Sequence, residues 1–475
     1  MSRPQLEVAD IIRSAGVDFI ARNRHWLRWT HLKVLLAIAR CRTAALGGHI
    51  DKCTRCGHRA TISYNSCPQS ALPEVCQTGA RERWIAARRR ELLPTPYVHL
   101  VFTLPPQLAS LALQNKKVIY GLLLRASAET LLEVARNPAH LGAQIGFFSV
   151  LHTWNQKLQL HPHVHCVVPA GGLSHDHACW IRSRPRFFLP IAVLRRVFRG
   201  KFAAALKSAF EHRQLHLGGE LAPLTHPKFF AAWLRPLFRK DWIVYSKPPF
   251  GGPEYVLQYL GRYTHRVAIS NHRLVTLTDD HVTFRWRDSA EHNRQKVMTV
   301  SRDEFLRRFL LHLLPKGFVR IRHFGFLANR RRATLLPRCF AALHTSSPKS
   351  ETSTTPTPHP LWRCPNCGGP MAVVERFTAA QLQLRSPPPW PQLHELTRSH
   401  TALATLQSVS PTCLSLPSRH LLSIPASVHF RHRLVFAPCA DSFSTGLDDS
   451  RQLLNPFSLH SICISPASAA PAASF

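Results

Sequence analysis

The segment that decides the fold is HPHVHCVVP, residues 161–169. Its apolar, β-branched run from Val164 to Val168 is followed by the turn sequence PAGG at 169–172, so the pattern predicts a buried strand. Side chains alternate between the two faces of a strand, and His163 and His165 therefore share one face. Two imidazoles at this spacing are able to bind one divalent cation, although strand histidines are more often ordinary packing residues.

A second segment, YVLQYLGRYTHR at residues 255–266, is typical of a helix. Tyr255, Tyr259 and Tyr263 fall at i, i+4 and i+8 on one face of it, a spacing that half-buried packing residues also show. A tyrosine hydroxyl has a pKa of about 10 and is a poor nucleophile alone. A metal ion that polarises a phosphodiester makes its attack feasible. Together the two segments predict cleavage of single-stranded DNA through a covalent phosphotyrosine.

The composition points to a polyanionic partner. The chain has 475 residues and a formal net charge of +35, nearly all of it before residue 390. Each phosphate that a basic side chain neutralises releases counterions, so DNA is the expected partner. The start of the chain has no apolar signal segment, and no run approaches the roughly 20 apolar residues of a membrane span. These features predict a cytoplasmic protein with no membrane partner, whose thirteen cysteines are thiols or zinc ligands rather than disulfides.

Ordered segments of the chain carry a family resemblance. They are HPHVHCVVPAGGLS (161–174), YLGRYTHRVAISNHRL (259–274), VTFRWRD (282–288) and GFVRIRHFGFLANR (317–330). Over roughly residues 10–380 the chain resembles the two-tyrosine rolling-circle transposases of the insertion sequence 91 family, which belong to the HUH endonucleases. The resemblance implies that His163 and His165 bind Mg²⁺ or Mn²⁺ and that Tyr259 and Tyr263 are the nucleophiles. A third metal ligand is expected, because two imidazoles leave such an ion underfilled. The candidates are His99, His152 and Gln156.

Cysteine pairs predict zinc binding. CTRCG at 53–57 has the spacing of a zinc knuckle, and Cys67 and Cys76 supply two further thiols to Cys53 and Cys56. The family carries a knuckle-like second half there, whereas this chain departs from it between Pro68 and Val75. A local frameshift is our hypothesis for the departure, and sequencing of the underlying DNA tests it. A second knuckle contains Cys364 and Cys367, for which Cys339 or a histidine is the expected partner.

The predicted architecture is α/β (α+β), with an HUH-like antiparallel sheet, packed helices and a small helical zinc-binding domain before them. Val98–Leu104 is expected to pair beside the histidine strand, and residues 106–160 are expected to be largely helical, Phe147–Leu158 included. The predicted domains are 1–95 for zinc binding and DNA recognition, 96–340 for catalysis, 341–385 for a Ser/Thr/Pro linker and the second knuckle, and 386–475 for a disordered tail. The expected DNA contacts are Arg262, Arg266, Arg330, Arg331 and Arg332.

These observations predict a transposase that cleaves and rejoins single-stranded DNA, with no small-molecule substrate. The oligomeric state, the target sequence and the order of the two tyrosines stay open at this stage. Replication initiators and relaxases use the same chemistry, and the departure at 68–75 also fits a catalytically inactive zinc DNA-binding remnant. RNA processing is disfavoured, since the sequence has no recognisable RNA-binding motif.

Overall fold

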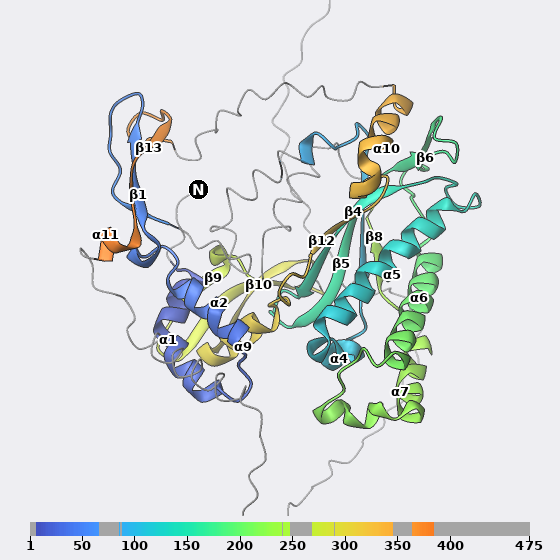
Figure 1. Ribbon diagram of the computed structural model, residues 1–475, viewed down its shortest axis with the longest axis horizontal. Helices are drawn as coiled ribbons and strands as arrows, with labels where there is room; N and C mark the ends of the chain where they lie inside the picture. Colours follow the sequence, from blue (N-terminus) through green and yellow to red (C-terminus); the bar gives the residue numbers. More distant parts are fainter. Residues whose placement is uncertain are drawn as a thin grey trace, which may run out of the picture. The chain divides into compact units, whose positions relative to one another are not determined.

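The computed structural model describes residues 6–65, 85, 88–239, 241–247, 268–288, 290–344 and 363–383. Its centre is a five-stranded antiparallel sheet of order β12-β4-β5-β3-β8 (Figure 1). The strands are β3 (Tyr97–Thr103), β4 (Gly146–Trp154), β5 (Leu160–Pro169), β8 (Val244–Ser246) and β12 (Ile321–Gly325). The predicted mixed α/β class with an antiparallel sheet is confirmed.

Helices cover one face of this sheet, and their apolar stripes form the main core. They are α4 (Ala109–Gln114), α5 (Lys116–Arg136), α6 (Ile191–Glu211) and α7 (Pro227–Arg239), seen together in Figure 1. Phe102, Leu151 and Val164 point from the sheet into this core and are fully buried. Each such side chain stabilises the fold by roughly 1.5–3 kcal/mol. Because side chains alternate along a strand, residues one position away, such as His163 and His165, lie on the opposite face.

The strand β4 corrects one sequence prediction. The sequence predicts a helix over Phe147–Leu158, whereas residues 146–154 form a strand between β5 and β12. Helices bury one face of this strand and the histidines pack on the other, so nearly every position is buried and the polar alternation of a surface strand is missing. The predicted pairing of β3 beside β5 is confirmed, with Val101 opposite His165 and Thr103 opposite His163.

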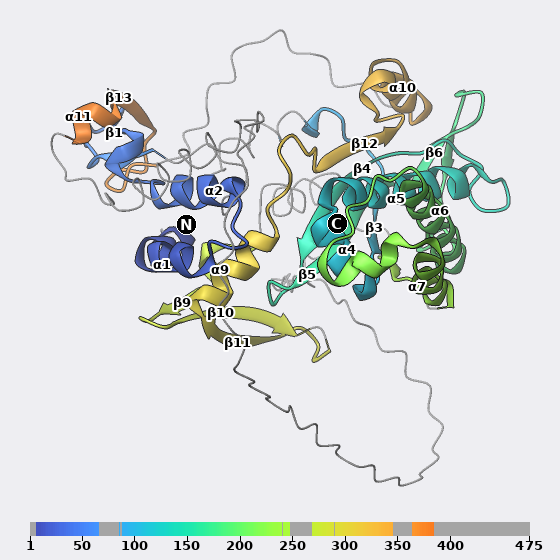
Figure 2. The same ribbon diagram turned by 60° about the horizontal axis from the view of Figure 1, so that its bottom comes forward.

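The first N-terminal helix packs against a helix that lies beside a second, smaller sheet. α1 (Val8–Asn23) and α2 (Trp29–Ala39) confirm the helices that the sequence predicts there. α1 contacts α9 (Arg302–Leu311), and an ion pair joins Arg22 to Asp303 at 2.8 Å. α9 lies beside the three-stranded sheet that Figure 2 shows, made of β9 (Leu274–Leu277), β10 (His281–Asp288) and β11 (Arg294–Ser301).

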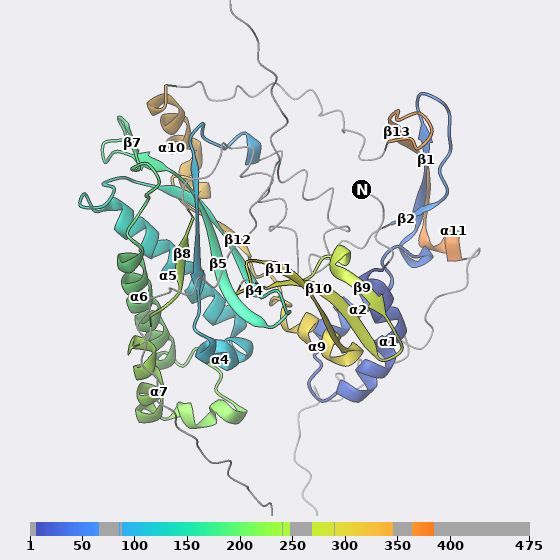
Figure 3. The same ribbon diagram turned by 180° about the vertical axis from the view of Figure 1, so that it is seen from behind.

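A third sheet joins segments from the two ends of the described chain. β1 (Gly48–Cys53) pairs antiparallel with β2 (Ser63–Tyr64) and with β13 (Met371–Phe377), as Figure 3 shows for β1 and β13. The short helix α11 (Ala379–Gln383) follows β13 and contacts the turn at Ala44–Leu46. Pairing of Cys53 with Met371 places the knuckle at residues 364–369 next to the knuckle at 53–57.

The hairpin of β6 (Gly171–Leu173) and β7 (Trp180–Arg182) follows the histidine strand and contacts α10 (Asn329–Ala342). Gly325 connects β12 to α10 with a φ of +60°, and a Cβ there would clash with the carbonyl of Ile145, so only glycine fits. None of the helices in the described part of the chain is long and apolar enough to cross a membrane.

Candidate functional site

Three histidines meet on the sheet face opposite the helices. His163 and His165 come from β5, and His152 comes from β4, directly across the strand pair from His163. Ring centroids are 4.4 Å apart for His152 and His165, 4.8 Å for His163 and His165, and 5.4 Å for His152 and His163. One ring nitrogen from each histidine lies within 4.8 Å of the others. Metal–nitrogen bonds of about 2.0–2.1 Å in a tetrahedron hold ligand nitrogens about 3.4 Å apart, a spacing within this limit, so the three rings are candidates to share one ion.

Hydrogen bonds indicate which nitrogens are available to that ion. Nδ1 of His163 lies 2.6 Å from the carbonyl oxygen of His161, which only accepts, so Nδ1 carries the proton and Nε2 keeps its lone pair. Nδ1 of His165 lies 2.8 Å from Nε2 of His99 on β3. Metal-binding histidines commonly donate their second ring N–H to another protein group in this way.

Burial keeps these imidazoles neutral. Burial, with smaller contributions from neighbouring histidines, lowers the pKa of His163 and of His165 well below 6.5. Burial likewise lowers the pKa of His99 to about 3. A neutral imidazole offers the lone pair that a metal ion needs. Imidazole donors suit Mn²⁺ and other transition metals better than Mg²⁺, which prefers oxygen ligands.

The structure separates the candidates for a third ligand. His152 belongs to the cluster, whereas His99 lies behind His165 as its hydrogen-bond partner. The backbone carbonyl of Gln156 accepts a hydrogen bond from Arg273. The signal for His152 is present in the sequence only once residues 146–154 are recognised as a strand. The predicted nucleophiles and two predicted DNA contacts, Tyr259, Tyr263, Arg262 and Arg266, lie outside the described residues.

Four cysteines form a second cluster. Cys53 Sγ lies 3.5 Å from Cys367 Sγ, and Cys56 Sγ lies 3.5 Å from Cys364 Sγ. All four sulfurs lie within 4.8 Å of one another. Zn–S bonds of about 2.3 Å in a tetrahedron place sulfurs about 3.8 Å apart, so the four thiols fit one zinc ion.

The two knuckles have the same backbone turn. Gly57 and Gly368 follow their second cysteines with φ of +74° and +66°, and each donates its N–H to the carbonyl of the first cysteine of its pair. Backbone N–H groups of Cys56 and Arg55 lie 3.5 and 3.4 Å from Cys53 Sγ, and this hydrogen bonding lowers the pKa of that thiol to about 6. A thiolate stabilised by backbone N–H groups is the form that binds zinc.

The cysteine cluster differs from the partners that the sequence suggests. Within the described chain Cys53 and Cys56 meet Cys364 and Cys367, while Cys67 and Cys76 lie outside the described residues, as does the segment 68–75. Cys339, the expected partner of the second knuckle, is instead buried with Leu336 and Phe340 of α10. Such a pairing, between cysteines more than 300 residues apart, has no local spacing to reveal it.

The arginines of α10 differ in their surroundings. Arg330 and Arg331 are exposed at the start of the helix. Arg332 is half-buried and forms an ion pair with Glu91 at 3.1 Å, and Glu91 also pairs with Arg88 at 3.2 Å. Arg330 and Arg331 are therefore available to a phosphate, whereas Arg332 already has a carboxylate partner.

Comparisons with known proteins agree with both clusters. A family described as "Putative transposase" matches residues 146–334, which include the three histidines, and a family described as "Transposase zinc-binding domain" matches residues 11–104, which include Cys53 and Cys56. The zinc-binding match and the four-cysteine cluster together support a zinc ion in this protein. No solved structure matches the chain.

Two relatives extend the similarity over most of the chain. "Putative transposase y4qJ" of Sinorhizobium fredii is 50% identical over 388 residues, which cover 79% of this chain and 97% of the relative. "Transposase for insertion sequence element IS801" of Pseudomonas savastanoi pv. phaseolicola is 29% identical over 385 residues, 75% of this chain and 86% of the relative. Similarity of this extent shows the family, and with it DNA as the partner: the chain belongs to the transposases of the insertion sequence 91 family.

Proposed function

We propose that this transposase cleaves and rejoins single-stranded DNA at a divalent metal held by His152, His163 and His165, using Tyr259 and Tyr263 as nucleophiles. The observation that carries the proposal is the convergence of three imidazoles from two adjacent strands, close enough to hold one ion. No carboxylate is part of this cluster in the described chain, and an all-imidazole donor set suits Mn²⁺ better than Mg²⁺.

The residues of the chain have distinct roles in this scheme. A metal ion held by the histidines supplies Lewis-acid polarisation of the scissile phosphodiester. The oxygen of one tyrosine forms a bond to phosphorus, and the bond from phosphorus to the 3′ oxygen breaks, leaving a 5′-phosphotyrosine and a free 3′-hydroxyl. Attack of a 3′-hydroxyl on the phosphotyrosine reverses this step: it forms a new phosphodiester, releases the tyrosine oxygen and rejoins strands without an external energy source.

Formation of a covalent adduct tests this function. The protein incubated with a labelled single-stranded oligonucleotide from the element's ends and Mn²⁺ should give a band that resists denaturing electrophoresis. The band should vanish in the Tyr259→Phe/Tyr263→Phe double variant and persist in Tyr255→Phe, the matched control four residues before Tyr259 in the sequence. Specific DNA binding without any adduct would identify the inactive remnant instead.

His99 is expected to orient His165 within this site. Replacing the second partner of a metal-binding histidine typically weakens metal affinity about 10–100-fold. His99→Phe, which fills the buried space without accepting a hydrogen bond, should weaken Mn²⁺ binding by that amount in a calorimetric titration. His99→Gln, whose side-chain oxygen accepts, should restore most of the affinity. Equal affinities for the two variants would contradict the role.

A further inference from the structure

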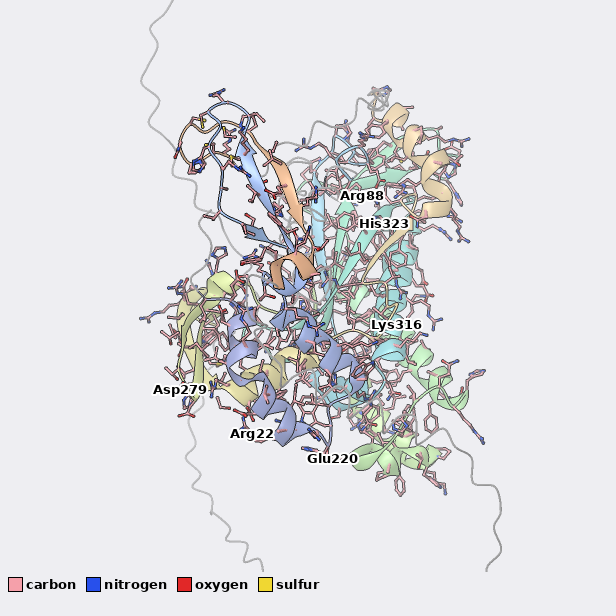
Figure 4. All side chains as sticks on the ribbon, turned by 60° about the vertical axis from the view of Figure 1, so that its left-hand side comes forward. Arg22, Arg88, Glu220, Asp279, Lys316 and His323 are labelled. Atoms are coloured by element: carbon pink, nitrogen blue, oxygen red, sulfur yellow. The ribbon has the colours of Figure 1, made fainter. Side chains whose placement is uncertain are left out.

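A cleft at the start of α2 gathers positive charge and shares no lining residue with the histidine cluster. It has a volume of about 690 Å³ and is lined by the loop before α2, the junction of α4 with α5 and the segment after α9. None of its lining residues is acidic, and one of them, Lys316, is labelled in Figure 4. The lining residues that carry or accept a positive charge are Arg28, His31, Lys116, Lys117 and Lys316.

Three of these cations are exposed. Arg28, Lys117 and Lys316 face solvent, and none of the ion pairs within the described ranges involves them. An exposed cation with no carboxylate partner is free to meet a phosphate. A groove that presents several of them at once raises the local concentration of anions.

Two helices also begin at this cleft. α2 starts at Trp29 and α5 at Lys116, and both residues line it. The start of a helix carries a partial positive charge, which acidic residues usually offset. Neither helix has an acidic residue in its first turn, and Arg28 and Lys117 add positive charge there instead. This arrangement is unfavourable in isolation and becomes favourable when an anion is present.

The inner part of the cleft shows the same excess of positive charge. Lys116 is half-buried and its Nζ donates to the carbonyl oxygens of Leu311 and Leu313, at 2.8 and 3.0 Å. Burial and the charge of Arg28 lower the pKa of Lys116 to about 8. Burial and the charges of Lys116 and Arg28 lower the pKa of His31 to about 4. Each cation therefore destabilises its neighbours, and a bound anion would relieve that repulsion.

An exposed aromatic ring lies beside these charges. Trp29 keeps 44% of its surface exposed, and Nζ of Lys33 lies 5.2 Å from its ring centroid. Trp26 also lines the cleft, held by a 2.9 Å hydrogen bond from its indole N–H to Asn23. Sites that bind single-stranded DNA combine such a ring, on which any base stacks, with cations that contact the backbone.

We propose that this cleft binds a short stretch of single-stranded DNA, with phosphates at the starts of α2 and α5 and a base stacked on Trp29. The substrate class rests on the proposed function, while the cleft itself involves none of the residues of the metal clusters. It would hold a part of the strand that is not being cleaved, and so would raise affinity without taking part in the chemistry.

Binding of fluorescein-labelled oligothymidylate, followed by anisotropy with zinc-loaded protein and no added Mg²⁺ or Mn²⁺, tests the proposal. Lys117→Glu/Lys316→Glu should weaken binding at least about tenfold and reduce the magnitude of the slope of log affinity against log salt by about 1.4, since each of the two lost phosphate contacts on a single strand removes about 0.7. The control Lys228→Glu/Arg239→Glu makes the same charge change on α7 and should weaken binding less than about threefold. Trp29→Ala should weaken binding about tenfold, and Trp29→Phe should keep most of the affinity.

Photo-cross-linking gives a second readout. An oligonucleotide carrying 5-iododeoxyuridine should cross-link to the peptide that contains Trp29. The proposal would be overturned if the test and control charge variants lost the same amount of affinity and cross-links formed only at other peptides. Tighter binding of a duplex of the same length would also overturn it. A protein that forms no phosphotyrosine adduct yet binds through this cleft would refute the proposed cleavage chemistry alone. Adduct formation without any effect of these variants on binding would refute the cleft alone.

Discussion

Replacing His163 with alanine is expected to lower the rate of adduct formation by roughly 10³-fold, equivalent to about 4 kcal/mol of transition-state stabilisation. His163 is one of the three histidines of the cluster, and its Nε2 lone pair is left available by the hydrogen bond from Nδ1 to the carbonyl of His161. Removal of the ring deletes one of the three proposed metal ligands and is expected to leave the strand pairing unchanged. Single-turnover cleavage of an end oligonucleotide with Mn²⁺ measures the effect.

His161→Ala is the matched control for this experiment. His161 contributes its backbone carbonyl to His163, and alanine retains that carbonyl. The control should therefore stay within about tenfold of the original rate, and its circular dichroism should match that of His163→Ala. A His163→Ala protein that folds and cleaves at the original rate would show that the histidine cluster is only a packing feature.

Replacing Cys364 with serine is expected to remove zinc from the protein and to unfold the segment around β13. Every residue of β13 is exposed or only half-buried, so the strand has little apolar burial of its own. We therefore expect its attachment to β1 to depend on a metal shared by the two knuckles. Structural zinc sites contribute apparent free energies of about 10–16 kcal/mol in isolated zinc-finger peptides, more than such a small sheet gains by burial.

Metal analysis and hydrogen exchange measure this second effect. Zinc content should fall from one ion per chain to near zero, and amides of residues 371–377 should lose protection while those of β5 keep theirs. Cys179→Ser, which replaces an exposed cysteine outside the cluster, should leave both quantities unchanged. Retention of zinc in Cys364→Ser, with loss in Cys67→Ser/Cys76→Ser, would instead support the cysteine set suggested by the sequence alone.

The sequence predicts the elements whose pattern is local. The histidine strand β5, its neighbour β3 and the N-terminal helices follow from β-branched runs, alternation and helical spacing. The sequence does not predict β4, because a strand buried on both faces lacks the alternation of polar and apolar residues and cannot be told from a buried helix by its pattern. Because the sequence predicts a helix at β4, it offers His152 only as one of three candidates for the third metal ligand. The strand pairing that places His152 opposite His163 is visible only in the structure.

Sequence patterns also do not identify which residues far apart in the chain contact one another. Spacing identifies Cys53 with Cys56 and Cys364 with Cys367 as knuckles, but the choice of partner knuckle depends on the pairing of β1 with β13. The cleft beside α2 is a similar case. Its cations come from three separate segments, and none of them is basic enough alone to mark a site.

Pulsed electron paramagnetic resonance of bound Mn²⁺ tests the central claim most directly. One Mn²⁺ per chain should bind, with ¹⁴N couplings from three imidazoles that drop in number when His152, His163 or His165 is replaced singly. The tyrosine double variant should give the same spectrum, because the tyrosines act on the phosphodiester and not on the metal. A spectrum without nitrogen coupling, or one that is unchanged by all three histidine substitutions, would show that the catalytic metal is held elsewhere.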